Sequence, residues 1–142
     1  MRELSPKSTD YLRPDIEYNQ LSNETAVPLV VANAGYTLES RAAGGANCAV
    51  RTTGNGIIYL NGRLEMTSAG ATGGDKLVTF PTRFGPFQGT AHFNIQRDSS
   101  GTFSAFPIKV VKGASESWVE ALDTLLIGDF VFLNPIIYFK DS

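Results

Sequence analysis

The chain has 142 residues, of which 42% are hydrophobic and 18% are charged, and its formal net charge is -2. This length predicts one domain with a sizeable core, and the composition excludes disorder throughout the chain. The slightly acidic balance argues against nucleic-acid binding, which usually shows clustered Lys and Arg. Cys48 is the single cysteine, so an intrachain disulfide is excluded and stability must come from packing or assembly.

Residues 1–26 are polar and predict an extended N-terminal arm or linker, with a short helix starting at Pro14 as the alternative. Scattered acidic residues in this segment lead us to expect no signal peptide. Residues 27–142 are expected to form the folded domain. The apolar runs 130–133 and 136–139 are far shorter than the roughly 20 residues needed to cross a bilayer, so we expect no membrane insertion.

The first half of this domain predicts strands joined by glycine-rich turns. Residues 27–31 are rich in β-branched side chains and predict a strand near an edge, because it contains a proline. Residues 36–40 and 48–51 predict two more strands, separated by a loop of small residues. Residues 53–56 contain glycine and asparagine, which tolerate the positive φ of a tight turn, and predict a β-hairpin.

The clearest alternation lies between Gly56 and Met66 and predicts one half-buried strand. Its inner side carries Ile58, Leu60, Gly62 and Leu64, and its outer side carries Tyr59, Asn61, Arg63 and Glu65. The outer side is either solvated or packed against another subunit, where Tyr and Arg are common. The small residues 67–75 that follow predict an exposed and mobile loop.

The second half continues in the same way. Residues 77–80 predict a short strand, and residues 89–96 and 103–111 predict a hairpin with a turn at residues 98–101. Strands are also expected at residues 117–122, 124–127, 130–133 and 136–139. Residues 116–127 leave a helical turn or two as the alternative, because their apolar residues also recur at spacings of three and four. Eight to ten short strands predict an all-β fold, an antiparallel barrel or jelly-roll-like sandwich.

Six short segments follow one another in a recognisable order. They are Val30–Tyr36, Val50-Arg51, Gly56–Leu64, Gly73-Gly74, Phe80-Pro81 and Arg83–Pro86. This order resembles the C-terminal head domains of receptor-binding and baseplate proteins from tailed phages of Gram-positive bacteria, the lactococcal phages especially. The resemblance covers about residues 27–139. The chain departs from the family pattern by an inserted alanine before Gly35, by Tyr36 in place of Trp, and by Phe80 in place of Leu. The 26 residues before the domain are also too few for the family's shoulder and neck.

The resemblance implies a homotrimer of β-barrel heads that binds host cell-wall polysaccharide or another surface saccharide, often a phosphate-bearing one. It implies a place in the virion, at the tail tip or baseplate, with other baseplate or tail proteins as partners. Such a protein is made in the host cytoplasm. Weak saccharide sites become effective when several copies act together, because linked sites raise the effective concentration.

Saccharide sites typically combine an aromatic platform with Asp, Asn, His or Arg side chains. His92 and Asn94 share the outward face of their predicted strand, and Trp118 is the single tryptophan. The resemblance implies ligand contacts at these three residues, and Arg97 and Asp98 beside the next turn are further candidates. The alternative is that His92 is solvated or interfacial, that Trp118 is a packing residue, and that Arg97 and Asp98 only add solubility.

We expect no enzymatic activity, no cofactor and no metal site. The sequence lacks the Gly-x-Ser-x-Gly and His-Glu-x-x-His motifs and has one histidine. Cys48 with His92 is disfavoured as a catalytic pair, because a lone cysteine in a β-rich core is usually inert. Glu116 and Glu120 are disfavoured as glycosidase carboxylates, because nothing in the sequence sets their separation. The second hypothesis is a structural virion protein, a baseplate, fibre or decoration subunit that binds other proteins and no sugar.

Overall fold

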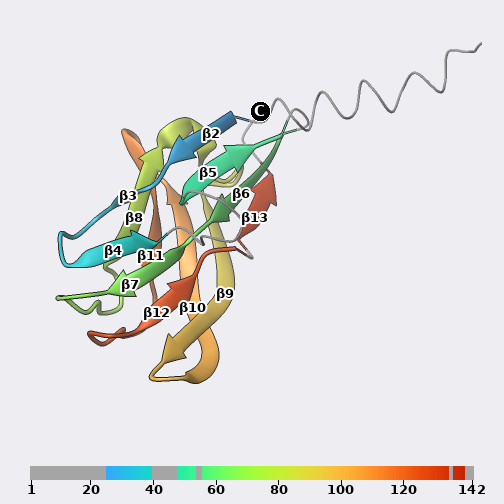
Figure 1. Cartoon of the computed structure of the whole chain (residues 1–142). Coiled ribbons are helices and arrows are strands. Elements are labelled where there is room, and N and C mark those ends of the chain that lie inside the picture. The colour runs from blue at the N-terminus through green and yellow to red at the C-terminus, as the bar shows by residue number, and fades with distance from the viewer. Residues whose placement is uncertain (1–24, 40–47, 54–55, 135, 140–142) are drawn as a thin grey trace, which may run out of the picture.

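The computed structural model describes residues 25–39, 48–53, 56–134 and 136–139, and it folds into two antiparallel sheets (Figure 1). The larger sheet has eight strands in the order β3 (Val30–Val31), β8 (Lys76–Pro81), β11 (Glu116–Ala121), β10 (Thr102–Lys112), β9 (Thr90–Ser99), β12 (Phe130–Phe132), β7 (Arg63–Met66) and β4 (Tyr36–Glu39). The smaller sheet has four strands in the order β13 (Ile137–Phe139), β6 (Ile57–Asn61), β5 (Ala49–Thr52) and β2 (Thr25–Pro28).

The predicted all-β class is confirmed, and the eight-stranded sheet curls into a nearly closed barrel. The two sheets contain twelve strands, more than the expected eight to ten. Most of the predicted N-terminal arm lies outside the described residues. The predicted boundary of the arm at residue 26 is wrong by two residues, because Thr25 and Ala26 belong to β2 and pair with β5.

Two predicted strands are divided because the chain passes from one sheet to the other. The segment 27–31 breaks at Leu29, whose N–H donates to the carbonyl of Cys48 at 3.1 Å. The central segment 56–66 breaks at Gly62, which has a φ of +129° and separates β6 from β7. The predicted burial alternation nevertheless holds on both sides of Gly62, since Leu60 and Leu64 are both fully buried. A left-handed glycine turns the chain here without moving its apolar face away from the core.

Three expectations about residues 67–75 and 116–127 are wrong. Residues 124–127 do not form a strand, because Leu125 makes only an isolated bridge to Ala71 within a loop. Ala71 itself is 2% exposed, so the loop 67–75 contributes a core residue, whereas we expected none of its side chains to pack. The helical alternative for residues 116–127 is also wrong, since Glu116–Ala121 is the strand β11.

One hydrophobic core joins the two sheets. It includes Ile58 from β6, Phe106 from β10 and Val131 from β12, all without exposed surface. Burial of each such side chain stabilises the fold by about 1.5–3 kcal/mol before the entropy cost of ordering the chain. Within the described ranges helix is limited to η3 (Thr82–Phe84), so no helix there has the length and apolarity to cross a membrane.

The hairpin of β9 and β10 is the longest pair of strands and carries the candidate site. Its two-residue turn consists of Ser100 and Gly101, with φ values of 52° and 86°. A turn with positive φ at both central positions matches the right-handed twist of the strands. Glycine adopts a positive φ without strain, which explains its presence at position 101. The Asp98 carboxylate accepts a hydrogen bond from the Gly101 N–H at 2.8 Å and closes the turn.

Candidate functional site

The outer face of β9 carries a row of three exposed polar side chains. His92, Asn94 and Gln96 alternate with the inward Phe93 and Ile95. No hydrogen bond joins these three side chains to any residue in the described part of the chain. Their imidazole and amide groups are therefore available as donors and acceptors for a ligand.

A strip of apolar residues lies beside this row on β10. Pro107 pairs with Asn94, and Ala105 pairs with Gln96. Two shallow hollows result, of about 210 and 370 Å³, and Asn94 lines both of them. We call this surface the β9–β10 groove, and it consists of His92, Asn94, Gln96, Phe103, Ala105, Pro107 and Leu122. Its apolar side chains come from β10 and Leu122, and the polar groups of β9 stand along one side.

Trp118 lies on the same outer face but not in the groove. On β11 it pairs with Val111, whereas His92 is opposite Lys109 on β10, and Lys109 is opposite Glu120 on β11. His92 and Trp118 are thus two strands apart, about 10 Å across the sheet. The ion pair between Lys109 Nζ and Glu120 Oε2, at 3.4 Å, occupies the space between them.

The indole of Trp118 already has partners. Its Nε1–H donates to Glu120 Oε1 at 3.1 Å, and the Lys76 ammonium lies 4.0 Å from the ring centroid. Gly113 packs against the edge of the ring so closely that a Cβ there would lie 2.5 Å from Cζ3. These contacts give Trp118 a packing role and leave it a poor platform for a ligand ring.

Arg97 and Asp98 are placed away from His92 and Asn94. Arg97 lies on the opposite face of β9, where its Nε donates to Ser104 Oγ at 3.1 Å and its guanidinium lies 5.5 Å from the Phe106 ring. Asp98 is on the outer face but is engaged in the hairpin turn. The structure therefore brings His92 and Asn94 together and separates the other three predicted residues from them.

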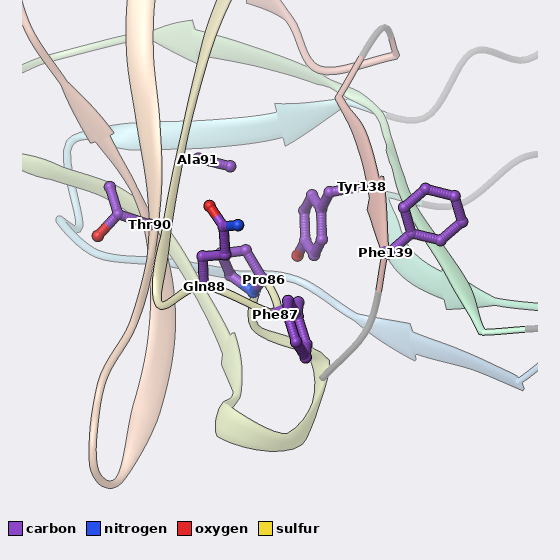
Figure 2. Close-up of a pocket in the computed structure, with 7 residues that line it drawn as sticks. All are labelled: Pro86, Phe87, Gln88, Thr90, Ala91, Tyr138 and Phe139. Carbon is purple, nitrogen blue, oxygen red and sulfur yellow. The ribbon is translucent and has the colours of Figure 1, made fainter. Parts of the chain in front are cut away.

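A pocket that the sequence did not predict lies between β13 and the turn that precedes β9 (Figure 2). It is lined by Pro86, Phe87, Gln88, Thr90, Ala91, Tyr138 and Phe139, and its volume is about 210 Å³. Phe87 and Phe139 are 57% and 71% exposed. No sequence pattern distinguishes these two phenylalanines from core residues, and they come together only because β13 passes beside the turn.

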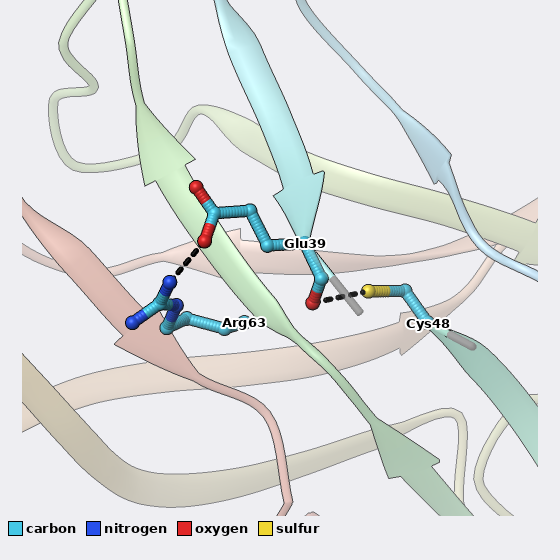
Figure 3. A network of polar contacts seen from close by, with 3 residues as sticks. All are labelled: Glu39, Cys48 and Arg63. Carbon is cyan, nitrogen blue, oxygen red and sulfur yellow. Dashed lines mark hydrogen bonds and ion pairs between the residues drawn. The ribbon is translucent and has the colours of Figure 1, made fainter. Parts of the chain in front are cut away.

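Another polar cluster lies on β7 and β4, with β12 between it and β9 (Figure 3). Arg63 on β7 forms an ion pair with Glu39 on β4, and its guanidinium lies 4.5 Å from the Phe130 ring. The hydrogen bond from Arg63 lowers the pKa of Glu39 below its usual value. A hydrogen bond with Glu39 raises the pKa of Glu65 in turn. In this cluster the two carboxyl groups are hydrogen-bonded to each other, and Glu39 forms the ion pair with the Arg63 guanidinium.

The residues considered for catalysis have other partners. The Cys48 thiol donates to the Glu39 carbonyl at 3.1 Å, and burial raises the pKa of that thiol, which disfavours a nucleophilic thiolate. Glu116 pairs with Lys76, and Glu120 pairs with Lys109. Among the residues that the structure describes, no three His, Cys, Asp or Glu side chains gather as a metal site would require.

Comparisons with protein families, with curated proteins and with solved structures found no match to this chain.

Proposed function

We propose that this chain is the attachment head of a phage tail or baseplate, which binds a host cell-surface saccharide as a homotrimer. The proposal combines the order of sequence segments that resembles phage receptor-binding heads with the barrel-like β fold. The observation that carries it is the β9–β10 groove. There, His92, Asn94 and Gln96 have no partner among the described residues and stand beside the apolar Pro107.

This combination suits a sugar chain better than an apolar ligand. A pyranose ring has hydroxyl groups at its rim and C–H groups on its faces. The amides of Asn94 and Gln96 can donate to and accept from the hydroxyls, and Pro107 offers an apolar surface to the ring face. The groove is shallow and open, so a single site would be weak. Three copies in one head would raise the avidity without any new contact.

The test is calorimetric titration of purified host wall polysaccharide, lactococcal first, into the protein. We expect binding by the wild type and a loss of about fivefold in affinity for each hydrogen bond removed, in His92→Ala and Asn94→Ala. Ser68→Ala, in an exposed loop on another part of the surface, is the control and should bind as the wild type does. Equal affinity in all three variants would place the ligand elsewhere, and no binding by the wild type would refute the adhesin.

The second candidate is a structural virion protein that binds other proteins. It is favoured by Leu126 and Ile127, two adjacent aliphatic residues that are 64% and 63% exposed in the loop before β12. Exposed aliphatic groups of this kind are found at protein interfaces. If Leu126→Ser with Ile127→Ser abolishes docking to virion particles while the wild type binds no polysaccharide, this candidate replaces the first. Light scattering that reports a monomer would count against the trimer.

A further inference from the structure

The pocket of Figure 2 combines an exposed aromatic ring with an uncommitted amide. Phe87 stands at its mouth, and the side chain of Gln88 projects into it beside Tyr138. No described residue forms a hydrogen bond with the Gln88 side chain. The Tyr138 hydroxyl, in contrast, is already committed, because it donates to the Phe84 carbonyl at 2.7 Å.

The backbone holds this arrangement in place. The Phe87 N–H donates to the Phe139 carbonyl at 3.2 Å, which ties the turn to β13. The Gly89 N–H donates to the Pro86 carbonyl at 3.0 Å and closes the turn itself. The aromatic ring and the amide are therefore positioned before any ligand arrives, which lowers the entropy cost of binding.

The lining also indicates what kind of ligand fits. None of the seven lining residues is charged. A phosphate or carboxylate bound here would lose its hydration without gaining a cation. A neutral ring with an apolar face and hydroxyls at its rim would use both groups that the pocket offers.

We propose that this pocket binds an uncharged pyranose ring, stacked on Phe87 and hydrogen-bonded by the Gln88 amide. The inference rests on the proposed function and names the ligand class that this function would use here.

The position of the pocket supports an extended saccharide. Thr90, one of its lining residues, is the outward neighbour of His92 on β9. Residues two apart on a strand are about 7 Å from each other, so the pocket and the β9–β10 groove lie at neighbouring positions along β9. One polysaccharide chain that passes around this end of β9 would contact both.

The test is a ¹H–¹⁵N correlation titration of the protein with methyl β-D-glucopyranoside, methyl N-acetyl-β-D-glucosaminide and glucose 6-phosphate. We expect at least one neutral glycoside to shift the amide signals of Phe87 and Gln88, and the phosphorylated sugar to bind more weakly. Phe87→Leu keeps the apolar character but removes the aromatic face, and it should weaken binding about tenfold. Phe87→Tyr keeps the face and should bind as the wild type does.

Val30→Ala is the control, because Val30 is 58% exposed against 57% for Phe87 and lines neither the pocket nor the groove. Equal losses in Phe87→Leu and Val30→Ala would overturn the pocket, as would tighter binding of the phosphorylated sugar. If polysaccharide binds and only the His92 and Asn94 variants weaken it, the proposed function stands and the pocket inference fails. If no sugar and no polysaccharide binds, both fail. Thermal melting of each variant confirms that it is folded.

Discussion

The thiol of Cys48 lies directly against Gly62, at the point where the chain leaves the four-stranded sheet and enters the eight-stranded one. A Cβ atom at position 62 would lie 2.6 Å from Cys48 Sγ and 2.9 Å from its Cβ. Both backbone polar groups of Gly62 are also hydrogen-bonded. Its N–H donates to Asn134 Oδ1 at 3.1 Å, and its carbonyl accepts from the Leu133 N–H at 2.9 Å. The corner therefore depends on a glycine for space as well as for backbone conformation.

Gly62→Ala is expected to lower the free energy of unfolding by about 1–3 kcal/mol, because alanine disfavours the positive φ and meets the cysteine. Urea unfolding followed by circular dichroism measures this loss. Cys48→Gly in the same chain should recover the steric part and leave the backbone part. If the double variant recovers the whole free energy of unfolding, the positive φ of residue 62 does not disfavour alanine. If Gly62→Ala alone is as stable as the wild type, the chain does not need a glycine at this corner.

The contributions of Glu39 and Glu65 to the stability of the fold should change in opposite directions as the pH rises. Glu39 has a lowered pKa, so its contribution is present above the usual value of 4.5 and is lost as pH falls through its folded pKa. Glu65 has a raised pKa, so its contribution is complete below 4.5 and is lost as pH rises through its folded pKa.

Thermal melting of Glu39→Gln and Glu65→Gln between pH 3 and pH 7 tests this sign. At neutral pH, Glu39→Gln should be less stable than the wild type by about 0–1 kcal/mol, because it loses the pair with Arg63. Glu65→Gln should be at least as stable as the wild type there, since a neutral amide keeps a donor for Glu39. Both differences should shrink as the pH falls toward 3. Parallel curves for all three proteins would mean that the cluster does not titrate as a unit.

Asp129 is 4% exposed and connects the loop before β12 to the hairpin. Its Oδ1 accepts from Ser99 Oγ at 2.8 Å, and its Oδ2 accepts from the Leu126 N–H at 2.9 Å. Asp129→Ala leaves both donors without their partner and should cost about 1.5–3 kcal/mol in urea unfolding. Asp123→Ala, an exposed carboxylate in the same loop, is the control and should cost much less. If both variants lose the same free energy of unfolding, the buried hydrogen bonds of Asp129 contribute no more to stability than an exposed carboxylate does.

Tyr138 should remain un-ionised in alkaline solution until the fold opens. Burial raises the pKa of its hydroxyl far above the usual 10.0. The neutral phenol therefore stabilises the fold below pH 10, and this contribution is lost as pH rises beyond the unfolded pKa. In an absorbance titration of tyrosine ionisation, the Tyr138→Phe variant should differ from the wild type only in the step that accompanies unfolding, where its amplitude should be smaller. The variant should also be about 1–3 kcal/mol less stable at neutral pH, because the Phe84 carbonyl loses its donor. If the variant instead loses ionisation amplitude at a pH below the unfolding transition, the Tyr138 hydroxyl ionises in the folded protein and the prediction is wrong.

Local pattern determined the larger part of this fold. Apolar alternation identified the β9–β10 hairpin, its turn at Gly101 and the outward direction of His92 and Asn94, because side chains on a strand point to opposite faces with a period of two. Alternation also identified the buried side of the segment around Gly62. These features depend on neighbours in the sequence, and the number of short predicted strands was enough to place the chain among all-β domains.

Tertiary structure decided how strands divide and which distant residues meet. The apolar run 27–31 continues through Leu29, and the alternation of residues 56–66 continues through Gly62. Nothing in the sequence therefore shows that the chain passes into another sheet at these two residues. The Trp118 ring contacts Lys76 from β8, which is distant in the sequence, and Phe87 meets Phe139 only across the chain. Strand pairing is a choice among many partners of similar local character, and the packing of the whole core makes that choice.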